Sequence, residues 1–407
     1  MNKDFTVLRT LANIIAEISA LPAQDEKRAL WTSNNDLVPT RPLVYIDQLP
    51  WHEINLSSEM TLECKNPYLR TIEQRLRETL YRWNHFPCDM VVEARIDIPH
   101  AYSGLLYGAR IKEKGAWTNQ DNDIYSHEYQ EQLDSEEDID KLSFDEIVLD
   151  HKRDEKNYQL CSQIFEGILP VRFEGVQIHA GVWDRIAQLR KPDNLLIDLI
   201  DRPELTEKIV IKLRDITMDS VKQCERLGLL DDQLQYVHCT GAYTNDLPKV
   251  EGNTVLSKNV WAYGMSQIFS TVSKSMHEEF DIDLLMPLYD MFGLMYYGCC
   301  EPLHNKIDIV RKIKNVRKIS ISPWADIEKG AESLSGDFVF SLKPRPSLIG
   351  NGIFEEAEIR EQMLSAKKAC EKHKTPCEFI LKDVSTVQNR LDFLDRWNQV
   401  AMDIAIS

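Results

Sequence analysis

Long apolar runs are missing from this sequence. No stretch reaches the roughly 18 consecutive apolar residues that suggest a membrane-spanning helix. The first stretch, MNKDFTVLRTLANIIAEISAL, carries charges throughout and spaces its apolar residues as an amphipathic helix does. It lacks the uninterrupted apolar segment of a signal peptide. We therefore expect a cytoplasmic protein with no membrane partner.

An excess of positive charge is also missing. The chain has 48 Lys and Arg against 65 Asp and Glu, which gives a formal net charge of −17 at pH 7. Binding to nucleic acid by neutralising phosphates needs clustered Lys and Arg. The negative net charge therefore excludes nucleic acid as an expected partner. It does not identify another partner, because a negative charge is equally expected of a protein that is simply soluble.

The cysteines lack a regular spacing. There are nine of them, an odd number, scattered over 407 residues with no C-x-x-C or H-x-C motif. A disulfide framework needs a small chain with closely spaced, paired cysteines. Reduced thiols in a cytoplasmic protein are the simplest interpretation.

The usual nucleotide-binding signatures are absent as well. We find no G-x-G-x-x-G after the first predicted strand and no G-x-x-x-x-G-K-[ST] anywhere. An open doubly wound sheet is therefore the second choice of architecture, although strands and helices alternate along the chain. The eight predicted strands are 41–47, 89–97, 176–184, 234–241, 294–300, 317–326, 337–344 and 378–387. The predicted helices are 1–40, 66–85, a long tract ending at Gly228, 258–280, 302–315, 326–334 and 353–374.

Eight such units predict a closed (β/α)8 TIM barrel, an α/β fold, as a single domain over residues 1–407. Several of these strands are apolar on both faces, as a covered parallel sheet requires. Residues 1–40 would form an N-terminal helical extension. Residues 112–160 are polar and acidic, and we expect an insertion or lid there.

Polar residues follow the predicted strands, and chemistry in such barrels lies at the C-terminal strand ends. An apolar barrel interior, with polar residues at the C-terminal ends of its strands, predicts a functional pocket at that end. The proposed catalytic residues are Asp47, Glu301 and Asp383, with Asp383 as a general base. The proposed substrate-binding residues are Trp51, His52, His179, Trp183, Trp324, Lys343 and Lys382. His179 could equally be a core residue, and the tryptophans could simply cover the core at the rim of the barrel.

The segment MYYGCCEPLHNKID places two adjacent cysteines and a glutamate at a strand end. Strand alternation predicts that Tyr297, Cys299 and Glu301 share one face and that Cys300 points the other way. Cysteine thiolates with a histidine and a carboxylate can bind zinc, so the predicted metal ligands are Cys299, Cys300, His238 and Glu301. Such a zinc ion would lower the pKa of a substrate thiol or hydroxyl. Two buried cysteines that simply fill space are the alternative.

Several segments resemble the uroporphyrinogen decarboxylase superfamily. They are VWDRIAQLRKPDNLLIDLIDRPELTEKIV (182–210), SQIFSTVSKSMHEEFDID (266–283), YYGCCEPL (296–303), ISISPWADIEKGAE (319–332) and KDVSTVQNRLDFLDRW (382–397). The last two are similar to a subgroup found beside corrinoid-linked methyltransferases. In methylcobamide:coenzyme M methyltransferases, zinc is bound by an H-x-C on strand five and a cysteine after strand eight. Here Cys299 matches the first cysteine, Tyr297 replaces the histidine, and Asp383 lies near the position of the second cysteine.

The resemblance implies three functions. The first is a methyltransferase that moves a methyl group between a small substrate and a corrinoid (cobalamin), possibly on a separate corrinoid protein, with or without zinc. The second is a decarboxylase (lyase) of uroporphyrinogen or another carboxylated substrate. The chain lacks the arginines of the decarboxylase motif R-Q-A-G-R-Y and has Asp47 and Glu53 after Arg41 instead, which disfavours a substrate with four acetate groups. The third is a non-catalytic corrinoid- or porphyrin-binding protein. The resemblance also implies a homodimer.

Overall fold

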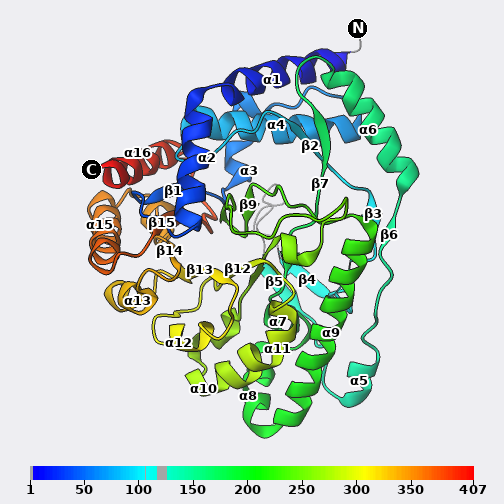
Figure 1. Ribbon diagram of the computed structural model, residues 1–407, viewed down its shortest axis with the longest axis vertical. Helices are drawn as coiled ribbons and strands as arrows, with labels where there is room; N and C mark the ends of the chain where they lie inside the picture. The colour runs from blue at the N-terminus through cyan, green and yellow to red at the C-terminus, as the bar shows by residue number, and fades with distance from the viewer. Residues whose placement is uncertain (1–2, 106, 117–125) are drawn as a thin grey trace.

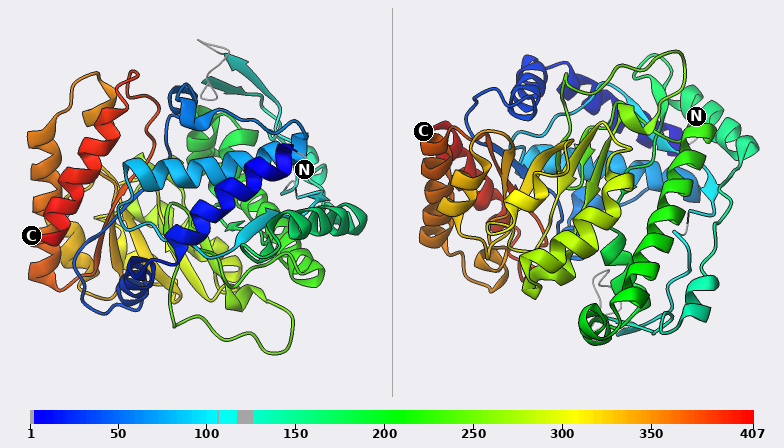
Figure 2. Two further views of the ribbon diagram at one scale, coloured as in Figure 1. Left: turned by 90° about the horizontal axis from the view of Figure 1, so that it is seen from above. Right: turned by 60° about the horizontal axis from the view of Figure 1, so that its bottom comes forward.

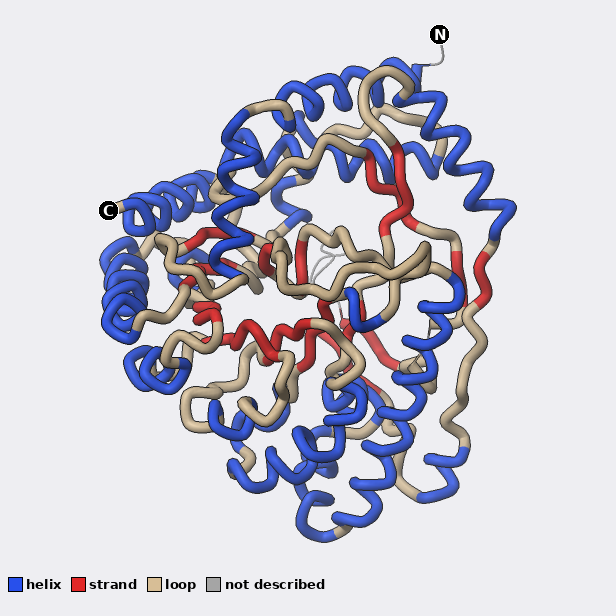
Figure 3. The backbone as a smooth tube through the Cα atoms, viewed as in Figure 1, coloured by secondary structure: helices blue, strands red, loops and turns tan. Residues whose placement is uncertain are grey.

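The computed structural model describes residues 3–105, 107–116 and 126–407. Its centre is a curled parallel sheet of seven strands, seen as a red arc in Figure 3. In spatial order these strands are β1 (Leu43–Ile46), β15 (Cys377–Leu381), β14 (Val339–Leu342), β13 (Val316–Ile321), β12 (Leu294–Tyr297), β11 (Trp261–Gly264) and β8 (Ile178–His179). Every pair in the sheet is parallel. The α/β class and the barrel-like curvature are confirmed.

The sheet does not close into a barrel in the described part of the chain, because β1 and β8 are its two edges. The predicted strand 89–97 would have filled this gap. Asp89 bonds β1 through its backbone N–H, which donates to Val44 O at 3.0 Å, and through its carboxylate, which accepts from Val44 N at 2.8 Å. The Asp89 side chain thus accepts the hydrogen bond of Val44 N that a backbone carbonyl of a neighbouring strand would otherwise accept. The chain then leaves, and β2 (Ile96–Pro99) pairs with β7 (Val171–Glu174) in a separate parallel ribbon.

The predicted strand 234–241 is wrong as a sheet strand. It is a short antiparallel hairpin of β9 (Tyr236–Val237) and β10 (Thr240–Gly241), which lies on the inner side of the curled sheet in Figure 1. The Trp261 indole N–H donates to Ala242 O at 2.9 Å, which ties the hairpin to the inner face of the sheet. The strand that occupies its expected place is β11, within the predicted helix 258–280. The run VWAYG is rich in β-branched and aromatic residues, which favour a strand.

Two layers of helices cover the sheet (Figures 1 and 2). Along β12, Met295 and Tyr297 belong to one apolar cluster, and Leu294 and Tyr296 belong to the other, as strand alternation requires. The outer layer contains α7 (Val182–Leu189), α8 (Pro192–Asp201), α9 (Pro203–Leu227), α10 (Lys274–His277), α11 (Leu284–Tyr289), α12 (Ile307–Val310), α13 (Ile327–Leu334), α14 (Ser347–Gly350), α15 (Glu356–His373) and α16 (Asp392–Ile406). The inner face packs against α1 (Lys3–Ser19), α2 (Pro22–Asn35), α4 (Pro67–His85) and α6 (His151–Phe165).

Residues 1–40 therefore take part in the core. The Trp31 side chain is 1% exposed, and its indole N–H donates to Asp89 O at 2.8 Å. Helix α4 matches its predicted span of 66–85 because Asn66 caps its first turn and Pro67 occupies the first helical position.

The segment 112–160 contains β4 (Glu113–Ala116), β5 (Ser126–Tyr129), α5 (Glu136–Asp140), β6 (Val148–Leu149) and α6; β6 pairs with β3 (Tyr102–Ser103). Residues 117–125 lie outside the described residues. The β4–β5 hairpin projects from the body of the molecule in the left view of Figure 2. Within the described ranges, no single helix passes a length and hydropathy test for crossing a membrane, and the bent pair α1–α2 passes it only when taken together.

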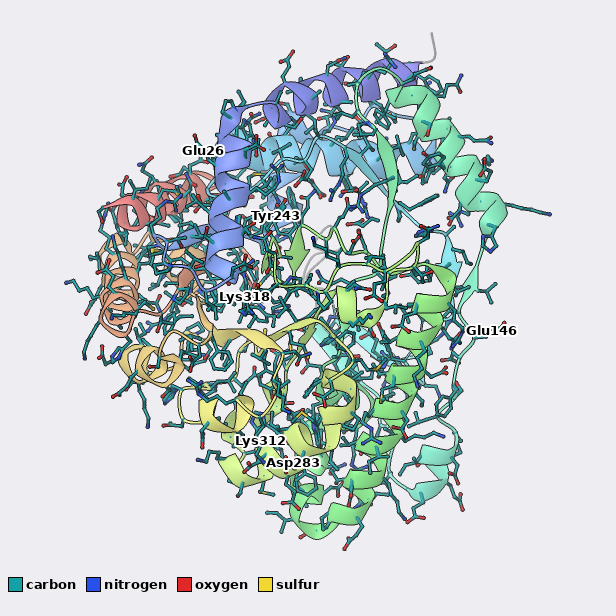
Figure 4. The ribbon with its side chains drawn as sticks, in the orientation of Figure 1. Glu26, Glu146, Tyr243, Asp283, Lys312 and Lys318 are labelled. Carbon is teal, nitrogen blue, oxygen red and sulfur yellow. The ribbon has the colours of Figure 1, made fainter. Side chains whose placement is uncertain are left out.

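A buried ion pair lies between the sheet and the hairpin. Lys318 Nζ donates to Glu378 Oε2 at 2.8 Å, to Thr240 Oγ1 at 3.0 Å and to Gly241 O at 2.9 Å. Figure 4 places Lys318 on the inner side of the curled sheet, near the end of α2. Both ends of the pair are fully buried. The pair therefore joins β13 and β15 to the hairpin that fills the interior.

Candidate active site

The vicinal cysteines follow β12 at the C-terminal edge of the sheet. Strand alternation breaks at Gly298, whose φ of +93° lies in the region that favours glycine. Tyr297, the last residue before this break, points into the outer helix layer, where its hydroxyl lies 2.8 Å from His277 Nε2. Cys299 and Cys300 lie together, with their sulfur atoms 3.7 Å apart. The prediction that Tyr297 shares a face with Cys299 is wrong for this reason.

A lysine lies directly beside these sulfur atoms. Lys382, which follows β15, has its Nζ 2.9 Å from Cys299 Sγ and 3.3 Å from His238 Nε2. Burial opposes its charge, but Cys239, Cys299 and Asp383 hold the pKa of Lys382 above its ordinary value. Burial lowers the pKa of His238. At neutral pH the site thus holds an ammonium group against a thiol and a neutral imidazole.

Asp383 and Cys300 form the solvent-facing side of this group. The Cys300 sulfur lies 3.9 Å from Asp383 Oδ2, and that same oxygen is 3.6 Å from Lys382 Nζ. The hydrogen bond between the two thiols lowers the pKa of Cys300, whereas this bond and burial raise the pKa of Cys299. Cys300 is therefore the cysteine of the pair that more readily becomes a thiolate, the nucleophilic form of the side chain.

Lys343 and Asp47 extend the site inward. Lys343 follows β14, is 3% exposed, donates to Ser341 Oγ at 2.7 Å and lies over the ring of Tyr296 at 5.1 Å. Burial raises the pKa of Asp47, against the opposing effect of Arg82, His238 and both lysines. The structure thus brings together Asp47, His238, Cys299, Cys300, Lys343, Lys382 and Asp383 from four strand ends and the hairpin.

His179 forms a second layer at the end of β8. Its ring stacks on Tyr263 with centroids 4.7 Å apart, and Tyr263 in turn stacks on His238 at 5.0 Å. Its Nε2 lies 3.8 Å from Asp184 Oδ2, which is too long for a hydrogen bond. Burial lowers the pKa of His179 to about 4 and raises the pKa of Asp184 to about 6. Burial therefore changes the pKa values of His179 and Asp184 more than the attraction between these two side chains does.

We expect Asp184→Asn to stabilise the protein at neutral pH. The pKa of Asp184 is about 6 in the folded state, so the folded state binds this proton more tightly than the unfolded state, and stability falls as the pH rises from about 4 to 6. Above that window the variant should gain up to about 3 kcal/mol, since one pKa unit corresponds to about 1.4 kcal/mol. The effect of His179 has the opposite sign but is common to both proteins. Urea unfolding across this window tests the prediction, which a pH-independent difference would contradict.

Glu301 is a positioning group rather than a free acid. It is 1% exposed, and its two oxygens accept from Ser266 N at 3.1 Å and Cys299 N at 2.9 Å. Its carboxylate thereby holds the turn that carries the cysteines. The catalytic role predicted for Glu301 is not supported by this geometry.

The tryptophans predicted to bind substrate have different positions. Trp183 is fully buried, and its indole N–H donates to Phe280 O at 3.0 Å, so it is a core residue. Trp51 and His52 lie on α3 (Trp51–Ile54), where the Trp51 ring packs under Arg82 at 5.3 Å from the centroid. Trp324 is 69% exposed after β13. Binding of substrate by Trp51, His52 and Trp324 stays a prediction.

Sequence reasoning missed three residues around this site. Tyr263 lies on β11, the strand taken for helix, and the β-rich run VWAYG was the available signal. Tyr296 points inward next to Tyr297, and its hydroxyl donates to Ser341 Oγ at 3.2 Å. Arg82, near the end of α4, donates to the backbone oxygens of Ile46 and Asp47. No local signal marks Arg82, because its partners lie more than thirty residues away in the chain.

The predicted zinc ligands do not form a metal site in this arrangement. Among the described residues, no three His, Cys, Asp or Glu side chains converge as ligands. Glu301 already accepts two backbone N–H groups, and the Lys382 ammonium lies between Cys299 and His238, where a cation would have to bind. A four-coordinate zinc ion needs these donors free and convergent. In this arrangement the four predicted ligands therefore do not fit a zinc site.

A cavity of about 380 Å³ lies beside the site, at the open side of the sheet. Tyr45, Arg82, Gln177 and Tyr236 contribute to its lining. Tyr45 and Tyr236 stack with their centroids 4.9 Å apart. Since Arg82 lines the cavity and donates to Asp47 O at 2.7 Å, this cavity is next to the inner end of the site.

The comparisons with known proteins bear on the fold. No family model matches the sequence, and no curated protein matches it. A solved structure of a methyltransferase from Methanosarcina mazei is similar, with a TM-score of 0.53, 9% sequence identity, and coverage of 92% of this chain and 97% of that chain. At this identity the likeness shows a shared α/β barrel-like fold along nearly the whole chain.

Proposed function

We propose that this chain is a methyltransferase that transfers a methyl group between a small substrate and a corrinoid. The observation that carries the proposal is the position of Lys382 Nζ, 2.9 Å from Cys299 Sγ and 3.3 Å from His238 Nε2. This group lies at the C-terminal strand ends of a fold shared with a methyltransferase. Catalysis in barrel-like α/β folds takes place at this edge.

The residues of this chain have separate roles in the proposal. Lys382 and Lys343 attract an acceptor that is anionic or becomes so on losing a proton, because ammonium groups in a partly dry site stabilise nearby negative charge. Asp383 has a side chain that is 47% exposed and lies beside Cys300, so it can take the proton of an incoming acceptor as a general base. A corrinoid would donate or receive the methyl group when it is bound at the mouth of the site.

The position of the hairpin β9–β10 favours a small substrate over a large one. It occupies the interior of the curled sheet, where Lys318 and Trp261 hold it. A large macrocycle would therefore have to approach from the C-terminal edge of the sheet. This disfavours the decarboxylase alternative, in which uroporphyrinogen itself would enter. A corrinoid protein as partner and a homodimer remain separate predictions.

The test incubates the protein with methylcobalamin and a small anionic thiol, 3-mercaptopropionate, and follows demethylation of the corrinoid by absorbance. We expect protein-dependent demethylation with the anionic thiol and a slower reaction with neutral 2-mercaptoethanol, because the lysines favour an anion. Conversion of uroporphyrinogen, followed by chromatography, would support the decarboxylase instead. Spectral binding of the corrinoid without turnover of any methyl donor would support a binding protein.

Metal analysis of protein purified without a chelator tests the zinc prediction separately. We expect less than stoichiometric zinc, because Lys382 occupies the place of a cation and Glu301 is committed to backbone N–H groups. Stoichiometric zinc that is lost on replacing both Cys299 and Cys300 would contradict this arrangement and restore the zinc-assisted version of the reaction.

A further inference from the structure

Cys299 and Cys300 form a pair of thiols with one open side. Their sulfur atoms are 3.7 Å apart, and Cys300 is exposed, whereas the other eight cysteines of the chain are buried. The turn that carries the pair is held by Glu301, which accepts the Cys299 N–H, and by Ser320, whose hydroxyl donates to Cys299 O at 2.8 Å. The two sulfur atoms are therefore presented together by a supported backbone.

The charge next to this pair selects the kind of ligand. Lys382 Nζ lies 2.9 Å from Cys299 Sγ, so an incoming metal cation would meet a like charge at the site. A neutral ligand meets no such repulsion. Sulfur is a soft donor, and two adjacent soft donors favour a soft atom that can take both.

We propose that Cys299 and Cys300 form a bidentate binding site for a neutral thiophilic electrophile, with trivalent arsenicals as the ligand class. An arsenical R–As=O reacts with the two thiols, so that two As–S bonds form, both S–H bonds and the As=O bond break, and one water molecule leaves. The arsenic stays trivalent, and no oxidant or reductant is needed. This site does not depend on the proposed methyl transfer.

The second thiol supplies most of the affinity. Once one As–S bond has formed, the neighbouring sulfur is held close at a high effective concentration, and such linkage raises affinity by about 10² to 10⁴ without further contacts. A matched comparison is present in the chain, since Cys370 and Cys377 also lie in contact with each other but are both buried. The pair that includes the exposed Cys300 should react in the folded protein, and the pair in which both cysteines are buried should not.

The test uses phenylarsine oxide with the full chain, followed by intact-mass measurement and counting of free thiols. We expect one adduct per chain, the loss of two free thiols, resistance to excess 2-mercaptoethanol, and removal by dithiothreitol. Peptide mapping should place the adduct on residues 299 and 300. The exposed variant Cys300→Ser should weaken binding in monothiol competition by about 100-fold or more. Cys370→Ser should leave it unchanged.

Three outcomes would overturn the proposal. They are equal binding by the wild type and Cys300→Ser, mapping of the adduct to Cys370 and Cys377, or protection of both thiols by equimolar Zn²⁺. The last outcome would show that the site accepts a cation despite Lys382. Circular dichroism of Cys300→Ser confirms that the variant is folded, and Cys300→Ala provides a second variant at the same exposed position.

Discussion

Lys382→Met is expected to lower the rate of methyl transfer by about 10² to 10³, the usual effect of removing one preorganised electrostatic group. Methionine keeps the length and apolar stem of the lysine but removes the charge beside Cys299. The neighbours Cys299 and His238 are neutral when the ammonium is absent, so the variant should remain folded. The measurement is demethylation of methylcobalamin with 3-mercaptopropionate, with kcat and KM determined separately.

The division between the two constants shows how Lys382 acts. A lower kcat with unchanged KM indicates stabilisation of charge in the transition state, and a higher KM alone indicates binding of the anionic acceptor. Lys329→Met is the matched control, because Lys329 lies on α13, is exposed and donates to the Asn305 side chain. A loss of less than about tenfold in Lys382→Met, equivalent to about 1.4 kcal/mol, would contradict the central role of this lysine.

Lys318→Met is expected to have the largest effect on stability, about 3 to 5 kcal/mol, because removing one partner of a buried pair leaves an uncompensated charge. Glu378 would lose its contact with Lys318 Nζ, and its other oxygen, Oε1, has no hydrogen-bond partner in the structure. Thr240 and Gly241 would also lose a donor, so the hairpin should loosen. Urea unfolding followed by circular dichroism measures the change.

Two further variants make this result specific. The double variant Lys318→Met/Glu378→Gln removes both charges and should recover part of the lost stability. Lys312→Met is the exposed control, since the Lys312 and Asp283 side chains that pair are about half exposed; both are labelled in the lower half of Figure 4. Surface pairs contribute about 0 to 1 kcal/mol. A similar loss for Lys318→Met and Lys312→Met would show that the buried pair does not hold the interior together.

Much of the fold was predictable because it depends on local patterns. The helix 66–85 begins at a capping Asn66 followed by Pro67, and the strands at 43–46, 294–297, 316–321, 339–342 and 377–381 are short, mostly apolar runs that overlap five of the predicted strands. Their parallel order follows from the helices between them. The predicted helix 258–280 was wrong over most of its length, because β11 and a short 3₁₀ helix (Gln267–Thr271) precede the helix that begins at Lys274. Periodicity cannot separate such a short strand from buried helix.

The candidate site was predictable in part for the same reason. Lys343, Lys382, Asp383 and the two cysteines follow apolar strands, and parallel strands bring their C-terminal ends to one edge. The direction of each side chain was not predictable. Gly298 reverses the alternation, so Cys299 and Cys300 lie together while Tyr297 points away.

By itself the sequence determined an α/β chain with an acidic surface, a parallel sheet and a polar edge where that sheet ends, since these follow from composition and local periodicity. Only the tertiary structure decided that the sheet stays open between β1 and β8, that residues 236–241 fill its interior, and that Lys382 lies against Cys299. These are contacts between residues far apart in the chain. They depend on how buried charges and hydrogen-bonding groups find partners once the core has formed, which no local pattern specifies.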